Sequence, residues 1–245
     1  MYGEVWNNYK KGFKFLLPFI LVQGLFESTS LNLDFDKYDF FGKGGNLIKN
    51  ISLFKQIIIN EQIPILFDLF IGTLFYSFLI VVIKALLNKN EINYKKNFKE
   101  SLGFYLRYLR LNMIIYSISV GLIIVGFWGI LIPFMVILLI LFNVLLIPCD
   151  AYLIYYNTSV GEALKKGMVL GKKHFGEILL LGVMVSIILA IIGGSMALVN
   201  INPEANLIGS VLMNFVSASV GSYLYMFTIT ICKKEEKVEE KIIEC

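Results

Sequence analysis

The sequence predicts an all-α integral membrane protein with six transmembrane helices, arranged as three helical hairpins with amphipathic helices at the membrane surface. Of its 245 residues, 57% are hydrophobic and only 16% are charged, against about a quarter charged in a typical soluble domain. No charged residue occurs from Ile114 to Leu146 or from Ile178 to Pro203. With a mean hydropathy of +0.73, the chain has more apolar residues than one soluble core would bury, and its apolar runs exceed the roughly 20 residues that a helix needs to cross a bilayer.

Six apolar segments are long enough to span with some tilt. They cover residues 13–33, 63–87, 109–127, 129–149, 178–199 and 207–231, within one polytopic domain over residues 1–245. None shows the sustained period of two that barrel strands require. The loop over residues 34–62 is the only sizeable one expected on the outer side. In it, Leu47, Ile51, Phe54 and Ile58 recur at helical spacing and predict a surface helix.

The distribution of positive charge orients this bundle. Eighteen lysines and arginines lie on one side of the predicted spans, and the other four all lie in the loop 34–62. Since cytoplasmic loops carry the excess of basic residues, we expect a multi-pass protein of the cell membrane with both termini in the cytoplasm. Residues 232–245 then form a cytoplasmic tail of mixed charge, which is either a solvated tail or a docking segment.

The segment 159–175 has the pattern of a helix that lies on the membrane. Ser159 and Glu162 form a capping box at its start. Small and apolar residues follow on one side at a 3.6-residue period, and Lys165, Lys166, Lys172 and Lys173 occupy the other side. The predicted partners are therefore the lipid bilayer and the anionic headgroups of its cytoplasmic face. Similar basic, aromatic segments at 8–14 and 93–99 suggest three hairpin repeats, although any lysine-rich inner loop would resemble them.

Ionisable side chains inside the predicted spans are the first candidates for a site, because burying a charge in a membrane costs several kcal/mol unless it is paired or hydrated. Glu27 lies late in the first span, and Asp68 lies early in the second, so both fall in the outer third of the membrane. Gln23 lies one turn from Glu27 on the same face. These groups either share a polar or ion site that takes a cation, a proton or a substrate amine, or point separately into headgroup water.

Small residues recur every four positions in the last two spans, and this spacing lets helix backbones approach closely. The connection between these spans is short, so we expect the two stripes to face each other. Contact of one stripe with another protomer is the alternative. The expected packing residues are Gly182, Ser186, Ala190 and Gly194 in one span and Ser210, Asn214, Ala218 and Ser222 in the other.

Several classes of protein find no support. The net charge of +4 is spread over loops and does not form a nucleic-acid footprint. The three cysteines form no CxxC pair, and His174 is the only histidine, so we expect no metal and no cofactor. No histidine lies in a span to activate Ser195 as a nucleophile, and no catalytic residue is expected. A membrane enzyme with an unfamiliar site remains a minor alternative.

One stretch shows a family likeness. Residues Pro148–Ile178 end a span in tyrosine-rich sequence and then enter a helix with Ser159, Glu162, Ala163, Leu164, Lys165 and Gly167. This run resembles a pattern in uncharacterised bacterial and archaeal six-helix membrane proteins, and it is similar to the membrane domain attached to some glycerophosphodiester phosphodiesterases. The resemblance implies a membrane-embedded accessory or transport-related role. The soluble hydrolase barrel of those enzymes is absent from the sequence, so their activity does not carry over.

Together these observations favour a non-enzymatic membrane protein, an accessory or structural module that binds lipid or a membrane partner. A small transporter or permease subunit with an outer-leaflet acidic site is the alternative. Transporters usually contain broken helices beside polar groups at the midplane. Here only Gly193-Gly194 and Pro133 could break a span, and neither adjoins a charged residue.

Overall fold

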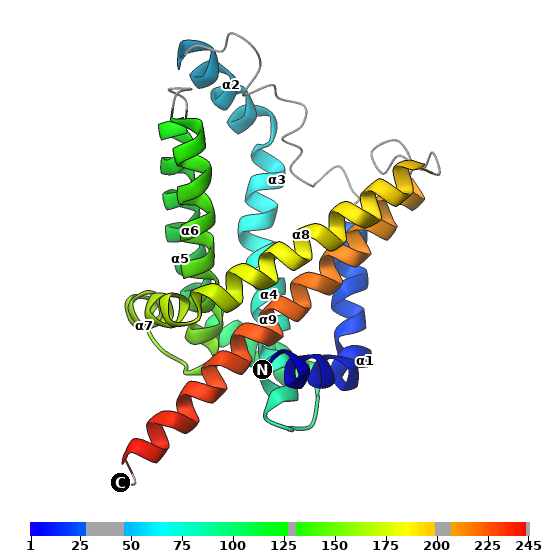
Figure 1. Cartoon of the computed structure of the whole chain (residues 1–245), viewed down its shortest axis with the longest axis vertical. Helices are drawn as coiled ribbons and strands as arrows, with labels where there is room; N and C mark the ends of the chain where they lie inside the picture. The colour runs from blue at the N-terminus through cyan, green and yellow to red at the C-terminus, as the bar shows by residue number, and fades with distance from the viewer. Residues whose placement is uncertain (28–46, 127–130, 199–206, 244–245) are drawn as a thin grey trace.

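A computed structural model describes residues 1–27, 47–126, 131–198 and 207–243, and over these ranges the regular structure is helical, with no strand. Figure 1 shows the helices in order along the chain. They are α1 (Tyr2–Glu27), α2 (Leu47–Asn60), α3 (Gln62–Phe67), the π-helical turn η1 (Asp68–Gly72), α4 (Thr73–Leu87), α5 (Tyr94–Gly126), α6 (Ile132–Tyr155), α7 (Val160–Lys173), α8 (Phe175–Leu198) and α9 (Leu207–Ile243).

Within the described ranges, five helices are long and apolar enough to cross a membrane. They cover Gln62–Leu87, Tyr94–Val125, Pro133–Tyr155, Phe175–Met196 and Gly209–Glu236. Each overlaps one of the last five predicted spans, so the prediction of an all-α protein with membrane-spanning helices is confirmed. The main difference is in α5, which begins at Tyr94 because the basic segment 93–99 continues into the span as one unbroken helix.

The first predicted span is not among these five helices. α1 begins at Tyr2 and ends at Glu27, and residues 28–33 lie outside the described ranges. The count of six spans therefore stays a prediction. Pro18 lies inside α1, where its ring removes a backbone hydrogen bond, and Figure 1 shows the helix in two arms that meet at an angle.

α5 lies beside α6 and α8 lies beside α9 in Figure 1, but residues 127–130 and 199–206 between them lie outside the described ranges, so the arrangement as three hairpins stays a prediction. α1 instead packs mainly along α9, in the antiparallel sense. The Tyr9 hydroxyl donates to the Ser219 carbonyl oxygen at 2.9 Å. Further along, a Cβ added to Gly24 would lie 3.2 Å from the backbone nitrogen of Phe215. This contact between the two ends of the chain does not follow from a simple series of hairpins.

The most closely packed part of the molecule lies in the later turns of α4, α6 and α9. Continuous buried runs extend over 79–83 in α4, 151–155 in α6 and 226–232 in α9. The middle of α8 over residues 183–191, in contrast, exposes most of its apolar side chains. Burial of apolar side chains against protein is therefore concentrated at one end of the bundle.

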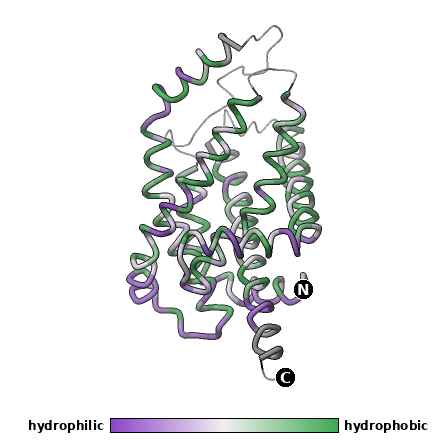
Figure 2. The backbone as a smooth tube through the Cα atoms, turned by 90° about the vertical axis from the view of Figure 1, so that its left-hand side faces the viewer, coloured by the Kyte–Doolittle hydropathy of each residue, from purple (hydrophilic) through white to green (hydrophobic). Residues whose placement is uncertain are grey.

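That same end carries most of the hydrophilic residues, as Figure 2 shows near the start of the chain. Here α9 continues through residues 232–243 as one helix, which differs from the solvated tail expected from its charge. The Tyr155 hydroxyl donates to Glu236 at 2.6 Å, and Lys173 Nζ contacts Glu235 at 2.6 Å. These contacts give the acidic residues partners on α6 and α7, so the helix continues past the apolar span.

Candidate functional site

The start of α7 is formed as the sequence predicts. The Ser159 side chain accepts a hydrogen bond from the backbone nitrogen of Glu162 at 3.3 Å, which satisfies one of the free N–H groups of the first turn. The Glu162 side chain does not complete the box. Its carboxylate lies 3.1 Å from Lys166 Nζ, one turn further on, and this hydrogen bond and charge raise the pKa of Lys166 above its usual value.

Glycines on one face of α7 bring it against α6. A Cβ on Gly167 would lie 2.7 Å from the Cα of Cys149, and one on Gly171 would lie 2.5 Å from the Leu145 carbonyl oxygen. Ala163, one turn before Gly167, is fully buried. This is a stripe of small residues at four-residue spacing, the arrangement that allows backbones to approach closely. From the sequence we expected these residues on the side of α7 that faces the membrane, and their four-residue spacing is the signal that indicates a neighbouring helix instead.

The four lysines of α7 are all exposed, but they fall into two pairs. Lys166 and Lys173 contact carboxylates, at Glu162 and Glu235 respectively. Lys165 and Lys172 form no ion pair with any residue that the structure describes. Two ammonium groups are thus available to an anion from outside the protein.

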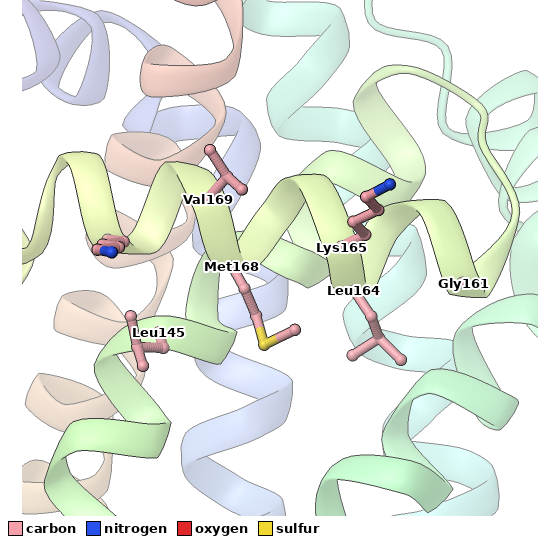
Figure 3. A pocket seen from close by; sticks show the side chains of 7 residues that line it. Leu145, Gly161, Leu164, Lys165, Met168 and Val169 are labelled. Atoms are coloured by element: carbon pink, nitrogen blue, oxygen red, sulfur yellow. The ribbon is translucent and has the colours of Figure 1, made fainter.

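Those two lysines border a shallow groove of about 480 Å³ between α7 and α6 (Figure 3). Met168 and Leu164 point to the side of α7 where Leu145 of α6 lies. The other lining residues are Gly161 and Val169. The groove therefore has an apolar surface and two lysines among its lining residues, and Figure 3 shows the Lys165 ammonium group on the side of α7 away from Met168 and Leu164.

A second groove, of about 640 Å³, lies on the α5 side of α7. It shares Gly161 and Leu164 with the first groove and adds Met113, Arg110 and Arg107. The Arg107 guanidinium donates to the Thr158 carbonyl oxygen at 3.0 Å and to the Asn157 side chain at 2.8 Å, so it holds the turn before α7. The apolar surface around the start of α7 thus runs from α5 to α6, with basic residues on both sides.

The other predicted polar residues lie toward the opposite end of the bundle. Asp68 is the first residue of η1, and it accepts a hydrogen bond of 2.5 Å from the Tyr116 hydroxyl of α5. Gly72 has no side chain and so leaves room for the Asp68 carboxylate beside η1. A Cβ at Gly72 would lie only 2.6 Å from Asp68 Oδ1. Single π-helical turns inside α-helices occur frequently at functional sites.

Gln23 lies near this turn on α1. Its side-chain nitrogen donates to the Tyr76 hydroxyl at 3.2 Å, and both residues line a cavity of about 150 Å³ together with Gly72. Gln23 and Asp68 therefore both lie near Gly72, where η1 ends and α4 begins. Glu27 is the last residue of α1, and its side chain lies outside the described part, so its expected proximity to Asp68 stays a prediction.

The small residues of α8 differ from their expected placement. Nothing lies within 4 Å of a Cβ added to Gly182 or Gly194. Ser186 and Ala190 are exposed. The expected contact between this stripe and α9 is therefore not formed.

α9 uses its small residues differently. Ala218 and Ser222 are fully buried, whereas Ser210 and Asn214 are half-buried. α1 takes the place that was expected for α8, because Gly24 brings its backbone against the turn of α9 at Phe215. α8 reaches α9 through a different face, where Gly193 lies near the Met213 side chain.

Among the described residues, no three His, Cys, Asp or Glu side chains come together as a metal site would require. Comparisons of the chain with protein-family models, with curated proteins and with solved structures found no match. The resemblance of residues 148–178 to the families named above accordingly stays a prediction. Any functional conclusion has to come from the sites themselves.

Proposed function

We propose that this protein is a non-enzymatic, multi-pass protein of the cell membrane that binds anionic lipid headgroups at its cytoplasmic face, as an accessory or structural module. The observation that supports this most is the groove of α7, in which Lys165 and Lys172 lack carboxylate partners among the described residues and border an apolar surface.

The chemistry of this groove favours one class of ligand. Each basic residue near an anionic membrane surface contributes about 1 kcal/mol to binding, which corresponds to roughly a fivefold change in affinity. The apolar side chains of Leu164 and Met168 would contact acyl chains while the lysines contact phosphate. Because Gly167 and Gly171 fix α7 against α6, these groups are held in place before lipid binds.

The test uses the full-length protein in detergent, with thermal unfolding followed as anionic or zwitterionic phospholipid is added. We expect anionic lipid to raise the unfolding temperature more, and added salt to reduce the difference, because salt screens exposed charges. Lys165→Gln and Lys172→Gln should each weaken the apparent lipid affinity about fivefold. Lys55→Gln on α2 is the matched control and should leave it unchanged. Equal stabilisation by both lipids in the wild-type protein would contradict the proposal.

A small transporter or permease subunit is the second candidate, and the setting of Asp68 favours it. This carboxylate lies in a span-length helix, at a π-helical turn and beside a cavity bordered by Gln23. A double-mutant cycle of Glu27→Gln and Asp68→Asn tests it. A shared ion site predicts strongly non-additive effects on stability, whereas two separately hydrated carboxylates predict effects that add.

A further inference from the structure

The two grooves beside α7 adjoin each other. The groove on the α6 side has a volume of about 480 Å³ and the groove on the α5 side about 640 Å³, and Gly161 and Leu164 line both. Gly161 has no side chain, and nothing lies within 4 Å of a Cβ added there. Only the start of α7 therefore lies between the two grooves, and its surface is open at Gly161.

The groove on the α5 side has its own positive charge. Arg110 lines it, is exposed and forms no ion pair with the residues that the structure describes. Arg107 is held by the Asn157 side chain at 2.8 Å and by the ring of Phe104, whose centroid lies 5.0 Å away. No described carboxylate pairs with Arg107 either. Two guanidinium groups thus keep their full charge on this side, and a guanidinium can bind phosphate through two parallel N–H donors.

The groove on the α6 side has the same combination of charge and apolar surface, with lysines in place of arginines. Lys165 and Lys172 line it, and neither has a carboxylate partner among the described residues. The Lys165 ammonium group lies on the side of α7 away from Leu164 and Met168 (Figure 3). A lysine at a membrane surface is expected to lie in this way, with its carbon chain beside lipid and its charge among the headgroups.

We propose that one phospholipid with two phosphate groups and two diacyl halves binds across the start of α7, with one half in each groove. This inference rests on the proposed binding of anionic lipid and adds the class of lipid. Arg107 and Arg110 bind one phosphate, Lys165 and Lys172 bind the other, and Leu164 contacts acyl chains on both sides. Basic pockets between membrane helices are known to bind headgroups of this kind.

The link between the two phosphates provides affinity without any additional contact. Once one half is bound, the second phosphate is held near its own groove at a high effective concentration, which can raise the overall affinity by roughly 10²–10⁴. Two separate phospholipids with one phosphate each bring the same charges and acyl chains but lack this gain. A two-phosphate lipid should therefore bind more tightly than an equal number of single phosphates.

The experiment titrates the full-length protein in detergent with cardiolipin or with phosphatidylglycerol of the same acyl chains, and follows thermal unfolding. The lipids are compared at equal phosphate concentration, so that charge and the number of acyl chains are the same. We expect the apparent affinity per phosphate to be at least about tenfold higher for cardiolipin. Inorganic pyrophosphate, which has linked phosphates but no acyl chains, should stabilise the protein much less.

Arg110→Gln and Lys172→Gln each remove one charge, on opposite sides of α7. Each should lower the preference for cardiolipin about fivefold, because both phosphates must be held for the link to contribute. Lys99→Gln is the matched control, since Lys99 is also exposed and without an ion pair among the described residues, about three turns before Arg110 on α5. It should leave the preference unchanged. All three positions are exposed, so normal folding is expected and is checked by unfolding without lipid.

The outcomes separate this inference from the proposed function. Equal affinity per phosphate for the two lipids would overturn the two-phosphate assignment and leave the binding of anionic lipid intact. A normally folded Arg110→Gln or Lys172→Gln variant with the wild-type preference would also overturn it, as would pyrophosphate that stabilises as well as cardiolipin. If neither anionic lipid stabilised the protein more than phosphatidylcholine does, both proposals would be wrong.

Discussion

α8 and α9 are both apolar helices of span length, but their surroundings differ. Both are apolar, span-length helices with small residues at every fourth position. In the most apolar 18-residue window of each, 11% of the residues of α8 are buried inside the protein, against 50% of those of α9. α9 packs against α1, α4 and α6 as well as α8. Hydropathy therefore predicts that both helices cross the membrane, but it does not predict which one lies inside the bundle.

The spacing of small residues is equally ambiguous. It shows where another backbone could approach, and the rest of the fold decides whether one does. In α7 the stripe Ala163, Gly167 and Gly171 is filled by α6, and in α9 Ala218 and Ser222 are buried, whereas Gly182 and Gly194 of α8 face open space. Larger side chains at these positions should therefore destabilise the protein where another backbone lies against the stripe. At matched positions of α8 they should have little effect on the free energy of unfolding.

The largest difference is expected between α7 and α8. Gly171→Leu should destabilise the protein by about 3 kcal/mol or more, because even its Cβ would meet the backbone of α6. Gly194→Leu adds the same side chain where nothing lies within 4 Å, so it should change little. Denaturation in detergent measures both. Similar losses from the two variants would mean that α8 also has a close neighbour.

The next largest difference is expected between α9 and α8 themselves. Ala218→Leu should cost about 1–3 kcal/mol by overpacking, since Ala218 is completely buried. Ala190→Leu is its exposed counterpart and should leave the free energy of unfolding unchanged. If Ala190→Leu were the more harmful of the two, the assignment of buried and exposed helices would be reversed.

A smaller effect is expected where α1 crosses α9. Gly24→Ala places a Cβ 3.2 Å from the Phe215 backbone nitrogen, and the neighbouring backbone must then shift by a few tenths of an ångström. We expect a loss of about 1 kcal/mol in the free energy of unfolding, at the lower end of overpacking. Gly182→Ala is the control in α8, and it should show no loss. An unchanged Gly24→Ala variant would argue against close packing of α1 on α9.

The smallest effect concerns two serines. The Ser222 hydroxyl is buried and has no hydrogen-bond partner among the described residues, so Ser222→Ala should be neutral or slightly stabilising, by less than about 0.5 kcal/mol. Ser186 donates to the Gly182 carbonyl oxygen of its own helix at the surface, and Ser186→Ala should also be neutral. A clear destabilisation by Ser222→Ala would show that its hydroxyl has a partner in the folded protein.

Much of the fold follows from local signals in the sequence. Long apolar runs predict five of the spans, because the bilayer sets their length. Ser159 predicts the start of α7, because a serine side chain can satisfy a free N–H group of the first turn. The helix over 47–60 follows from the spacing of its apolar residues.

The sites were less predictable, because their partners are distant in sequence. Asp68 was identified as an ionisable residue inside a predicted span, but Tyr116, which donates a hydrogen bond to it, lies 48 residues further along the chain. Gln23 was likewise identified on α1, but its partner Tyr76 lies 53 residues further along the chain.

The placement of α7 at the cytoplasmic face is central to the proposed function, and cysteine labelling tests it directly. The variants carry a single added cysteine at Asn60, which ends α2, or at Lys166 on α7, with Cys245 replaced. Cys149 and Cys232 are buried and can stay. A membrane-impermeant thiol reagent should label the Asn60→Cys variant in intact cells, and the Lys166→Cys variant only after lysis. Labelling of Lys166→Cys in intact cells would place the basic helix outside and contradict the account.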